Sequence, residues 1–339
     1  AGSLLAWEMM RRQLRVLVID DGDLNASQVA AGLINPVTGQ RLVKVVDIEQ
    51  LLPAAISCYR SLSLMFNRQF FVSLPMLRIL KNAAEQDIAR RRLTESAYQT
   101  FLRAHPYSVD RIISPHGLLE QLQAGFVNTR PLLDSLRDHF IANGSYRQVR
   151  LDYTELLLQP RPKWREVQPL HVVFCEGYRG VANPWFGNLP FQPAKGEILS
   201  CTADSVCPRR ILNFGHWLIP TGENDFRIGA TFESGKTDRQ PTPQARQRLL
   251  QALSVACPKI SVADVSAHQA GVRPATLDKQ PFIGTHPSYS NLHIFNGFGA
   301  KGSLSIPWHA SCFVDALTQK TPLPAHCDIR RYDQTFFPV

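Results

Sequence analysis

Several features that would place this chain in other protein classes are missing from its 339 residues. No apolar run approaches the roughly 18 residues that a helix needs to cross a membrane, so no membrane-spanning helix is predicted and no membrane partner is expected. There is no signal peptide, and the seven cysteines include no C-x-x-C pair. We therefore expect reduced thiols in a cytoplasmic protein, because disulfides are rare in that compartment.

The motifs of several common enzyme classes are also missing. Without a G-x-S-x-G sequence there is no support for a serine hydrolase, and no complete Walker motif is present. There is no H-E-x-x-H sequence and no cysteine pair with metal-ligand spacing, so no metal site is predicted. The scattered histidines are predicted to be isolated core or surface residues: His116, His268, His286 and His309.

The composition that remains is that of a globular protein with a positive charge. Hydrophobic residues make up 44% of the chain and charged residues 19%, and the length suits about two domains. The net charge of +9 comes from scattered arginines rather than a dense basic run. Such a balance could attract RNA, a membrane surface or anionic substrates. We favour a solvated basic surface with a few arginines reserved for an anionic cofactor.

The stretch from Ala1 to Pro36 has the pattern of half a nucleotide-binding unit. Small residues lead into a helix, a strand over 15–19 follows, and Asp20 and Asp21 come directly after it. This order is the back half of a dinucleotide-binding βαβ unit, in which Gly2 would be the third glycine and allow close helix–strand packing. Asp20 would then hydrogen-bond the adenosine ribose. The first strand and two glycines are absent, which a fragment of a longer protein explains best.

Two further segments are expected to approach the same ligand. The residues 25–36 are rich in small side chains, which lets backbone amides come close to an extended ligand, and Ser27 can donate to a phosphate. The strand 171–175 ends near Cys175, Glu176 and Gly177. Ligands of open α/β sheets lie beyond the carboxyl ends of the strands, so these three residues are expected beside the ligand of Asp20.

A second segment that could bind an anion lies near the C-terminus of the chain. The strand 292–295 leads into Asn296-Gly297-Phe298-Gly299-Ala300-Lys301-Gly302 and then a helix. Free amides at such a helix start could stabilise the negative charge of a reduced flavin, and Lys301 either adds a cation or simply faces solvent. Arg273 precedes Pro274, and its planar guanidinium suits bidentate capture of a carboxylate; a structural salt bridge is the alternative.

The periodicity predicts a discontinuous α/β chain, α+β overall. A nucleotide-binding domain is predicted over 1–64, 109–194 and 263–339, and an antiparallel-sheet domain over 65–108 and 195–262. A helix is predicted to start at Asp47, and Thr129 is a predicted N-cap. A strand over 70–80 is expected at a sheet edge because of Pro75, and short strands are expected over 108–117.

These motifs resemble the FAD-dependent amine and amino-acid oxidoreductases of the D-amino-acid oxidase superfamily, which includes glycine oxidase and sarcosine oxidase. The matches run in the family's order along nearly the whole chain: AGSLLAWEMMRR…VLVID, AS-x-x-AAG at 26–32, VVFCEG at 172–177, GVRPATLDKQPFIG at 271–284 and NGFGAKG at 296–302. The resemblance implies a Rossmann-like FAD-binding domain with a sheet-rich substrate domain over the flavin.

The resemblance also implies roles for individual residues. Asp20 would bind the adenosine ribose, Val149 would lie near the adenine, and Arg273 matches the arginine that holds the substrate carboxylate in glycine oxidase. Other positions would line the pyrophosphate and the flavin: Ser27, Ala31, Gly32, Gly299, Ala300, Lys301 and Gly302. With the positions argued above, the predicted cofactor-binding set is Gly2, Asp20, Asp21, Ser27, Ala31, Gly32, Val149, Cys175, Glu176, Gly177, Arg273, Gly297, Gly299, Ala300, Lys301 and Gly302. Arg273 and Lys301 are the predicted catalytic residues.

The implied activity is hydride transfer from a carbon bearing an amine to flavin N5, followed by hydrolysis of the imine and reoxidation by oxygen or another acceptor. The expected substrate is a small primary or secondary amine, in particular an amino acid. One alternative is a flavoenzyme of tRNA wobble-uridine modification, whose tRNA affinity would fall with added salt; otherwise no nucleic-acid partner is expected. Another alternative is a flavin-free scaffold or binding protein, because the first strand is absent.

Overall fold

The predicted helix–strand unit is present at the start of the fold, seen in a computed structural model that describes residues 1–105, 112–332 and 336–337. Helix α1 (Gly2–Arg11) buries Leu4, Leu5, Ala6 and Met9 against the core. Strand β1 (Val18–Asp20) pairs in parallel with β10 (Tyr146–Gln148). The strand is shorter than predicted and only half-buried, because within the described residues it pairs on one side alone.

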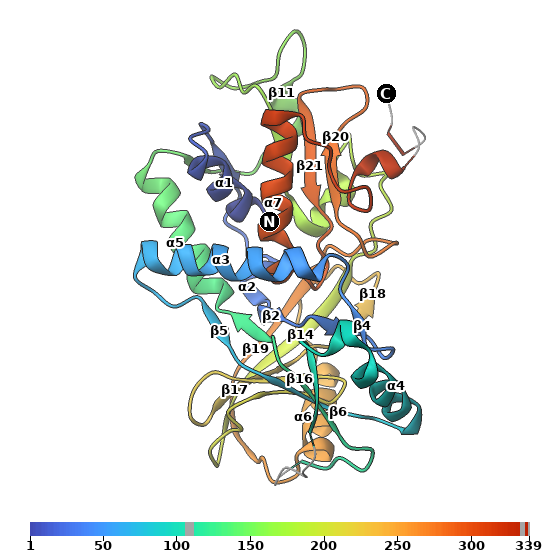
Figure 1. The fold of residues 1–339 in the computed structure, drawn as a ribbon. Helices are drawn as coiled ribbons and strands as arrows, with labels where there is room; N and C mark the ends of the chain where they lie inside the picture. The colour runs from blue at the N-terminus through green and yellow to red at the C-terminus, as the bar shows by residue number, and fades with distance from the viewer. Residues whose placement is uncertain (106–111, 333–335, 338–339) are drawn as a thin grey trace.

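A second small sheet holds the other predicted ligand-facing strands. Strand β13 (Val172–Phe174) pairs in parallel with β21 (Leu292–Asn296), and β20 (Phe282–Thr285) pairs antiparallel with β21. No strand in the described part of the chain joins β1 to β13, so β1–β10 and β13–β21–β20 form separate sheets. Figure 1 shows α7 (Gly302–Gln319) running beside β20 and β21, with α1 close to it.

The rest of the fold is dominated by one large, mostly antiparallel sheet. Its order is β18-β14-β17-β16-β15-β6-β8-β7, with β19 also paired to β14. The pair β6–β15 is parallel, so the sheet is not wholly antiparallel as predicted. The members are β6 (Met76–Ile79), β7 (Leu102–His105), β8 (Leu118–Gln121), β14 (Ala194–Ala203), β15 (Ile211–Asn213), β16 (Trp217–Pro220), β17 (Asp225–Gly229), β18 (Glu233–Ser234) and β19 (Val262–Arg273).

Two strands of this sheet differ from the predicted domain boundaries. Strand β8 lies between β6 and β7, and β19 pairs with β14 along most of its length, whereas the boundaries placed 109–194 and 263–339 in the nucleotide half. Interstrand hydrogen bonds fix both strands, and they link segments distant in sequence. The division into two domains otherwise stays a prediction.

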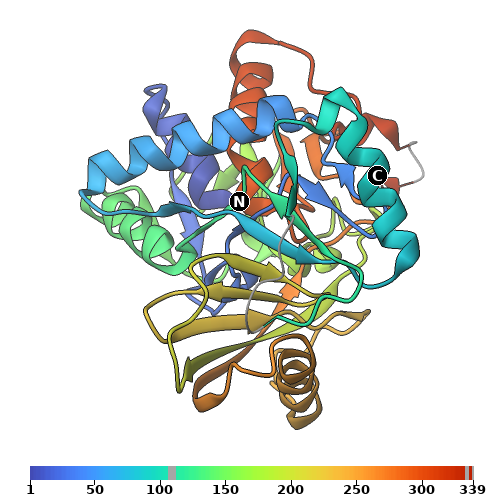
Figure 2. The ribbon, with the colours of Figure 1, turned by 60° about the horizontal axis from the view of Figure 1, so that its bottom comes forward.

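The two faces of the large sheet have different cover. Leu199 and Cys201 pack with Leu249 and Leu253 of α6 (Pro243–Ala256) on one face, which Figure 2 shows at the outside of the molecule. On the opposite face Ile198 belongs to a cluster with Val29 and Ala31 from the small-residue segment. The large sheet is therefore sandwiched between α6 and the segment predicted to face the cofactor.

The remaining elements complete the nucleotide half and the sheet edges. The helices are α2 (Ala26–Val29), α3 (Ile48–Phe66), α4 (Ala83–Thr94) and α5 (Thr129–Ala142). The short strands are β2 (Leu33–Ile34), β3 (Val37–Thr38), β4 (Val43–Lys44), β5 (Phe71–Ser73), β9 (Gly125–Val127), β11 (Leu156–Leu157) and β12 (Lys163–Trp164). Short 3₁₀ helices occur at Ser96–Tyr98, Tyr153–Glu155, Gly177–Ala182 and Ile329–Arg331. No described helix has the length and apolarity that crossing a membrane requires.

Several local predictions need correction. Pro75 splits the predicted strand into β5 and β6, which enter different sheets, and β6 is internal rather than at an edge. Asn128 precedes α5, whereas Thr129 is its first residue and donates its hydroxyl to the Ala30 carbonyl, 3.1 Å away. Asp47 does precede α3, but its side chain caps no amide. Of the strands predicted over 108–117, residues 106–111 lie outside the described residues and 112–117 contain no strand.

A buried histidine on β21 predicts how stability depends on pH. The Nδ1 atom of His293 lies 2.9 Å from the Thr285 hydroxyl and its Nε2 atom 2.9 Å from His171 Nδ1. Burial, and secondarily the charge of His171, lowers the pKa of His293 to about 3. In the unfolded chain histidine binds a proton near pH 6.5, so the unfolded state gains protons first as the pH falls. Stability should therefore fall below about pH 6.5, by up to roughly 1.4 kcal/mol per pH unit for this group.

The test is urea unfolding of the native chain and of His293→Gln between pH 7 and pH 5. The variant should show a flatter pH dependence, because the group that titrates only in the unfolded state is gone. His116→Gln, in a loop, is the matched control and should keep the native slope. An unchanged slope in His293→Gln would contradict this account.

Candidate active site

Strand register places two arginines on the same face of the large sheet. Arg273 of β19 is paired with Ala194 of β14, and Arg227 of β17 is paired with Ser200 of β14. Side chains alternate between faces along a strand, so positions 194 and 200 point to one side, and their partners point there too. The same face carries Gly271, where an added Cβ would lie 3.3 Å from the Ala26 Cα atom. Both arginines therefore share the face that packs on α2.

The guanidinium of Arg273 is half-buried and has no acidic partner. Its Nη1 atom donates to the Lys195 carbonyl at 3.2 Å and its Nη2 atom to the Thr231 carbonyl at 3.1 Å. Among the described residues no carboxylate forms an ion pair with it, and burial lowers its pKa. A partly buried cation whose only partners are carbonyl groups favours the binding of an anionic group. The predicted alternative of a structural salt bridge is not what the described structure shows.

Gly196 gives this guanidinium its space. A Cβ atom added at Gly196 would lie 2.2 Å from Arg273 Nη2 and 2.3 Å from Nη1. The ring of Phe232 lies on the same guanidinium, with its centroid 5.8 Å from Cζ, within the range of a cation–π contact. The position of Arg273 is thus set by a glycine, an aromatic ring and two carbonyls.

Arg227 was missed by the sequence analysis. Its Nη1 atom donates to the Ala30 carbonyl at 3.1 Å and its Nη2 atom to the Val29 carbonyl at 2.6 Å, and burial lowers its pKa. It therefore ties the large sheet to the end of α2. The available signal was a charged residue between Phe226 and Ile228, both fully buried, in an otherwise apolar strand. Such a signal marks a paired or functional cation, but it does not identify the partner.

The small-residue segment is held in one conformation. Asn25 and Gln28 form a capping box at the start of α2. Gly32 has φ +70°, and a Cβ added there would lie 1.9 Å from the Val127 carbonyl oxygen, so glycine is required. The hydroxyl of Ser27 has no hydrogen-bond partner among the described residues and remains able to donate to a ligand. Ala31 lies buried in the cluster between this segment and the large sheet.

The predicted adenosine end is partly assembled around β1. Asp20 Oδ1 accepts from the Gly22 amide at 2.8 Å, whereas Oδ2 has no partner in the described part of the chain. The Val149 amide donates to the Asp20 carbonyl at 2.9 Å, so these two predicted residues do lie together. Asp21 instead forms an ion pair with Arg179, which also pairs with Asp23. The Asp21 carboxylate is thus engaged within the protein.

The start of α1 and the end of β13 also meet. A Cβ added at Gly2 would lie 3.2 Å from the Cys175 Cβ atom, which confirms the predicted close helix–strand packing. Burial raises the pKa of the Cys175 thiol to about 12, so the thiol is neutral. Burial also raises the pKa of Glu176, whose carboxylate accepts from the Tyr153 hydroxyl at 2.5 Å and the Asn183 amide at 2.8 Å. Gly177 follows in a left-handed conformation with open space where a Cβ would stand.

The glycine-rich loop near the carboxyl end lies beside Arg273. Gly297 and Gly299 have φ of +80° and +53°, and the Gly299 amide donates to the Pro274 carbonyl at 3.1 Å. The loop ends at Gly302, where α7 begins, and the Gly302 and Ser303 amides have no partner within the helix. Tyr59, which is fully buried, donates its hydroxyl to the Ser303 carbonyl at 2.7 Å and fixes this turn.

Lys301 stands at the N-cap of α7 and is exposed when the residue is taken as a whole. Partial burial of its amine, followed by the charge of Lys279, lowers its pKa. The neighbouring Ala300 completes the turn into the helix. Free helix amides and a nearby lysine favour negative charge at this point, which fits the electron-rich edge of a flavin. The residues at this loop therefore fit FAD.

The family comparison agrees with this arrangement. The family described as FAD dependent oxidoreductase matches residues 1–316. The chain belongs to this family. Its cofactor is therefore FAD, and the alternative of a flavin-free scaffold has no support. The resemblance to the D-amino-acid oxidase superfamily is confirmed.

Individual relatives match parts of the chain. Glycine oxidase of Pseudomonas putida is 30% identical over 151 residues, which are 42% of this chain and 41% of the relative. The tRNA 5-methylaminomethyl-2-thiouridine biosynthesis bifunctional protein MnmC of Marinobacter nauticus is 23% identical over 351 residues, covering 94% of this chain and 54% of the relative. The chain thus spans about half of the length of these curated relatives or less.

Solved structures show the same fold. The crystal structure of glycine oxidase from Geobacillus kaustophilus superposes with a TM-score of 0.79 over 98% of this chain and 96% of that chain, at 18% identity. Iminodiacetate oxidase from Chelativorans sp. BNC1 superposes with a TM-score of 0.77 at the same identity. At such identities the likeness establishes the fold, and the roles of single residues stay predictions.

Proposed function

We propose that this chain oxidises the C–N bond of a small amino acid, with FAD as the hydride acceptor. The observation that carries the proposal is Arg273: a half-buried guanidinium without a carboxylate partner, on the sheet face that covers the small-residue segment. A substrate carboxylate would supply the negative charge that the Arg273 guanidinium lacks within the described residues. The names of several relatives, glycine oxidases, support the same substrate class. The cytoplasmic location expected from the thiol content stays a prediction.

The residues of this chain divide the work of such a reaction. Arg273 would bind the carboxylate and fix the orientation of the substrate carbon, with Gly196 and Phe232 holding the guanidinium in place. Arg227 would hold the α2 end against the sheet and keep this segment in position. The amides at the start of α7 would hold the flavin's electron-rich edge, and Asp20 and Ser27 would hold the ribose and phosphate. When bound, FAD supplies the acceptor for the hydride.

The substrate class is tested by comparing amines with and without a carboxylate. The FAD-loaded chain is assayed with glycine, sarcosine, alanine and methylamine at equal concentrations. At least one amino acid should exceed methylamine in kcat/KM by roughly 100-fold, because methylamine cannot use Arg273. Equal turnover of methylamine and the amino acids would contradict the proposal.

A second candidate is oxidation of an amine carried on a modified tRNA. The observations that favour it are the match to the Marinobacter nauticus bifunctional protein along 94% of this chain and the net charge of +9. This function requires tRNA binding that weakens steeply between 50 and 200 mM salt, because phosphate contacts release counterions. Fluorescence anisotropy with bulk tRNA at both salt concentrations decides it: absence of binding at low salt removes the candidate.

A test of Lys301 separates its charge from the backbone amides next to it. We expect Lys301→Gln to lower the reduction potential of bound FAD by roughly 20 mV, because about 1 kcal/mol of charge interaction corresponds to that shift for a two-electron couple. Lys320→Gln, at the other end of α7, is the matched control and should leave the potential unchanged. An unaltered potential in Lys301→Gln would assign the stabilisation to the backbone amides alone.

A further inference from the structure

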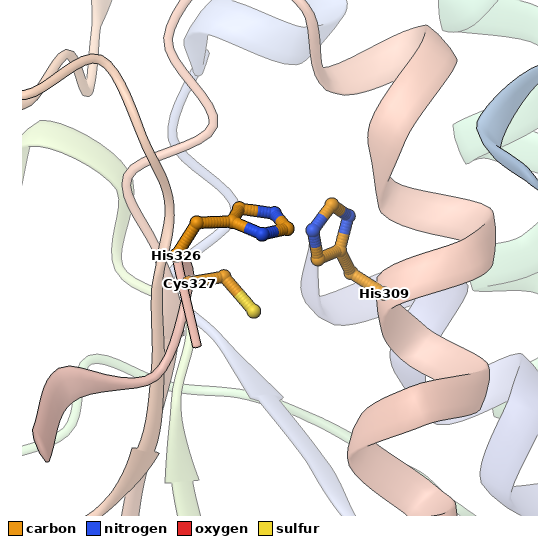
Figure 3. A group of neighbouring side chains, drawn as sticks. All are labelled: His309, His326 and Cys327. Carbon is orange, nitrogen blue, oxygen red and sulfur yellow. The ribbon is translucent and has the colours of Figure 1, made fainter. Parts of the chain in front are cut away.

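Two histidines and a cysteine meet at one side of α7, outside the site described above. His309 lies on α7, whereas His326 and Cys327 lie on the segment that follows it. One ligand atom of each residue lies within 4.8 Å of one ligand atom of the other two. Figure 3 shows the two imidazole rings facing each other across a small gap with the cysteine sulfur beside them. Sequence analysis treated His309 as isolated, because its neighbours in space are distant along the chain.

His309 presents a lone pair to this gap. Its Nδ1 atom lies 2.7 Å from the Ser305 carbonyl, an acceptor, so the proton of a neutral imidazole sits on Nδ1. Its side chain is almost completely buried, and Nε2 has no hydrogen-bond partner among the described residues. A buried imidazole nitrogen with a free lone pair either binds a metal ion or costs the folded state the free energy of an unsatisfied acceptor.

The other two side chains are placed by the backbone of the C-terminal segment. The Ile283 amide of β20 donates to the Cys327 carbonyl at 3.0 Å, which attaches this segment to the sheet. Cys327 is fully buried, and His326 is partly exposed, which leaves a path for an ion from solvent. Asp47 Oδ2 lies 3.4 Å from His326 Nε2. A metal-binding histidine usually donates a hydrogen bond from its other ring nitrogen to a carboxylate, which fixes the orientation of the ring.

We propose that His309, His326 and Cys327 bind a Zn²⁺ ion, with Asp47 orienting His326 and water in the fourth position. Two imidazoles and one thiolate form a ligand set that zinc accepts in tetrahedral geometry. Bond lengths of about 2.0–2.3 Å put tetrahedral ligands roughly 3.5 Å apart, so the side chains need to close by about 1 Å. Binding transfers the Cys327 thiol proton to water as the sulfur–zinc bond forms.

The ion would cross-link three parts of the fold. Within the described residues no disulfide connects them. It would hold the C-terminal segment to α7, and through Asp47 to the start of α3. Its role would therefore be structural. Because the ligands come from separate segments, the site would form only in the folded chain, and zinc would stabilise the folded state by binding it alone.

The test begins with the metal content of the full chain, purified without chelator and again after dialysis against chelator and addition of ZnCl₂. About one zinc per chain is expected in the second sample, with a higher thermal unfolding midpoint than in the chelated sample. Cobalt(II) added to the chelated chain should give a thiolate-to-cobalt charge-transfer band in the near ultraviolet. Cys327→Ser should remove this band, and Asp47→Asn should weaken zinc binding by about 10- to 100-fold.

Cys257→Ser is the matched control, because Cys257 is as fully buried as Cys327 but lies in another cluster. It should keep the cobalt band and the zinc-dependent rise in unfolding midpoint. If Cys327→Ser does not fold, His326→Gln, at a partly exposed position, takes its place; it removes one ligand and should weaken zinc binding. No zinc uptake by the folded native chain, copper in place of zinc, or equal loss in Cys257→Ser would overturn the proposal.

Discussion

Replacing Arg273 by alanine is expected to raise the KM for an amino-acid substrate by roughly 100-fold while leaving FAD bound. The guanidinium lacks an acidic partner in the described structure and donates only to the carbonyls of Lys195 and Thr231. A substrate carboxylate would form a charge-assisted pair with it in a partly desolvated place. Removing one partner of such a pair costs about 2–5 kcal/mol, and 2.7 kcal/mol corresponds to about 100-fold in affinity. Steady-state kinetics and the flavin absorbance of each variant measure the two effects separately.

Gly196→Ala tests the same residue without removing it. The added Cβ would lie about 2.2 Å from the guanidinium, so Arg273 must move while its charge remains. We expect a rise in KM in the same direction but smaller, and no change for an amine that lacks a carboxylate. Arg103→Ala, an exposed arginine of β7 in the same sheet, is the matched control and should keep native kinetics. Equal loss of FAD and substrate in Arg273→Ala would place the residue in the cofactor site instead.

Gly32→Ala is expected to destabilise the chain by at least about 3 kcal/mol, or to leave no folded protein. The residue has φ +70°, which costs a side chain about 1–2 kcal/mol. The added Cβ would also lie 1.9 Å from the Val127 carbonyl oxygen and 2.8 Å from its carbonyl carbon and amide nitrogen. These are backbone atoms, and the Val127 amide in turn donates to the Gly32 carbonyl at 2.9 Å. The overlap can therefore be relieved only by moving β9 away from the small-residue segment.

Gly39→Ala separates the two contributions, because Gly39 has φ +73° but open space where a Cβ would stand. The free energy of unfolding of Gly39→Ala should fall only by the cost of the left-handed conformation, about 1–2 kcal/mol. Urea unfolding of the native chain and of both variants, with flavin absorbance as a second reading, measures the difference. The same loss of stability in both variants would show that steric overlap with Val127 has no part in it.

The sequence predicted the elements that local chemistry determines. Gly2 was expected to allow close packing, and it lies against Cys175. The glycines of 297–302 were expected to form a tight loop into a helix, and positive φ at Gly297 and Gly299 with α7 at Gly302 confirms this. In each case the backbone conformation or the close packing favours glycine, so the pattern can be recognised from the local sequence.

Other features depended on which segments meet, and the sequence does not contain that information locally. Arg227 became a link to Ala30 only because β17 and α2 are brought together by the large sheet. Asp21 pairs with Arg179, which is far along the chain, and its expected place at the cofactor stays a prediction. Strand β8 joined the large sheet through hydrogen bonds with β6 and β7, which moved it across a predicted boundary. His309 gained its neighbours in the same way.

The most direct test of the account is reduction of the bound flavin by an amino acid without oxygen. The full chain is loaded with FAD, made anaerobic and mixed with glycine or sarcosine while the flavin absorbance is followed. The account predicts complete bleaching with at least one of them and none with acetate, which has the carboxylate but no amine. No bleaching with any amino acid or amine, in a sample whose flavin a chemical reductant bleaches fully, would contradict it.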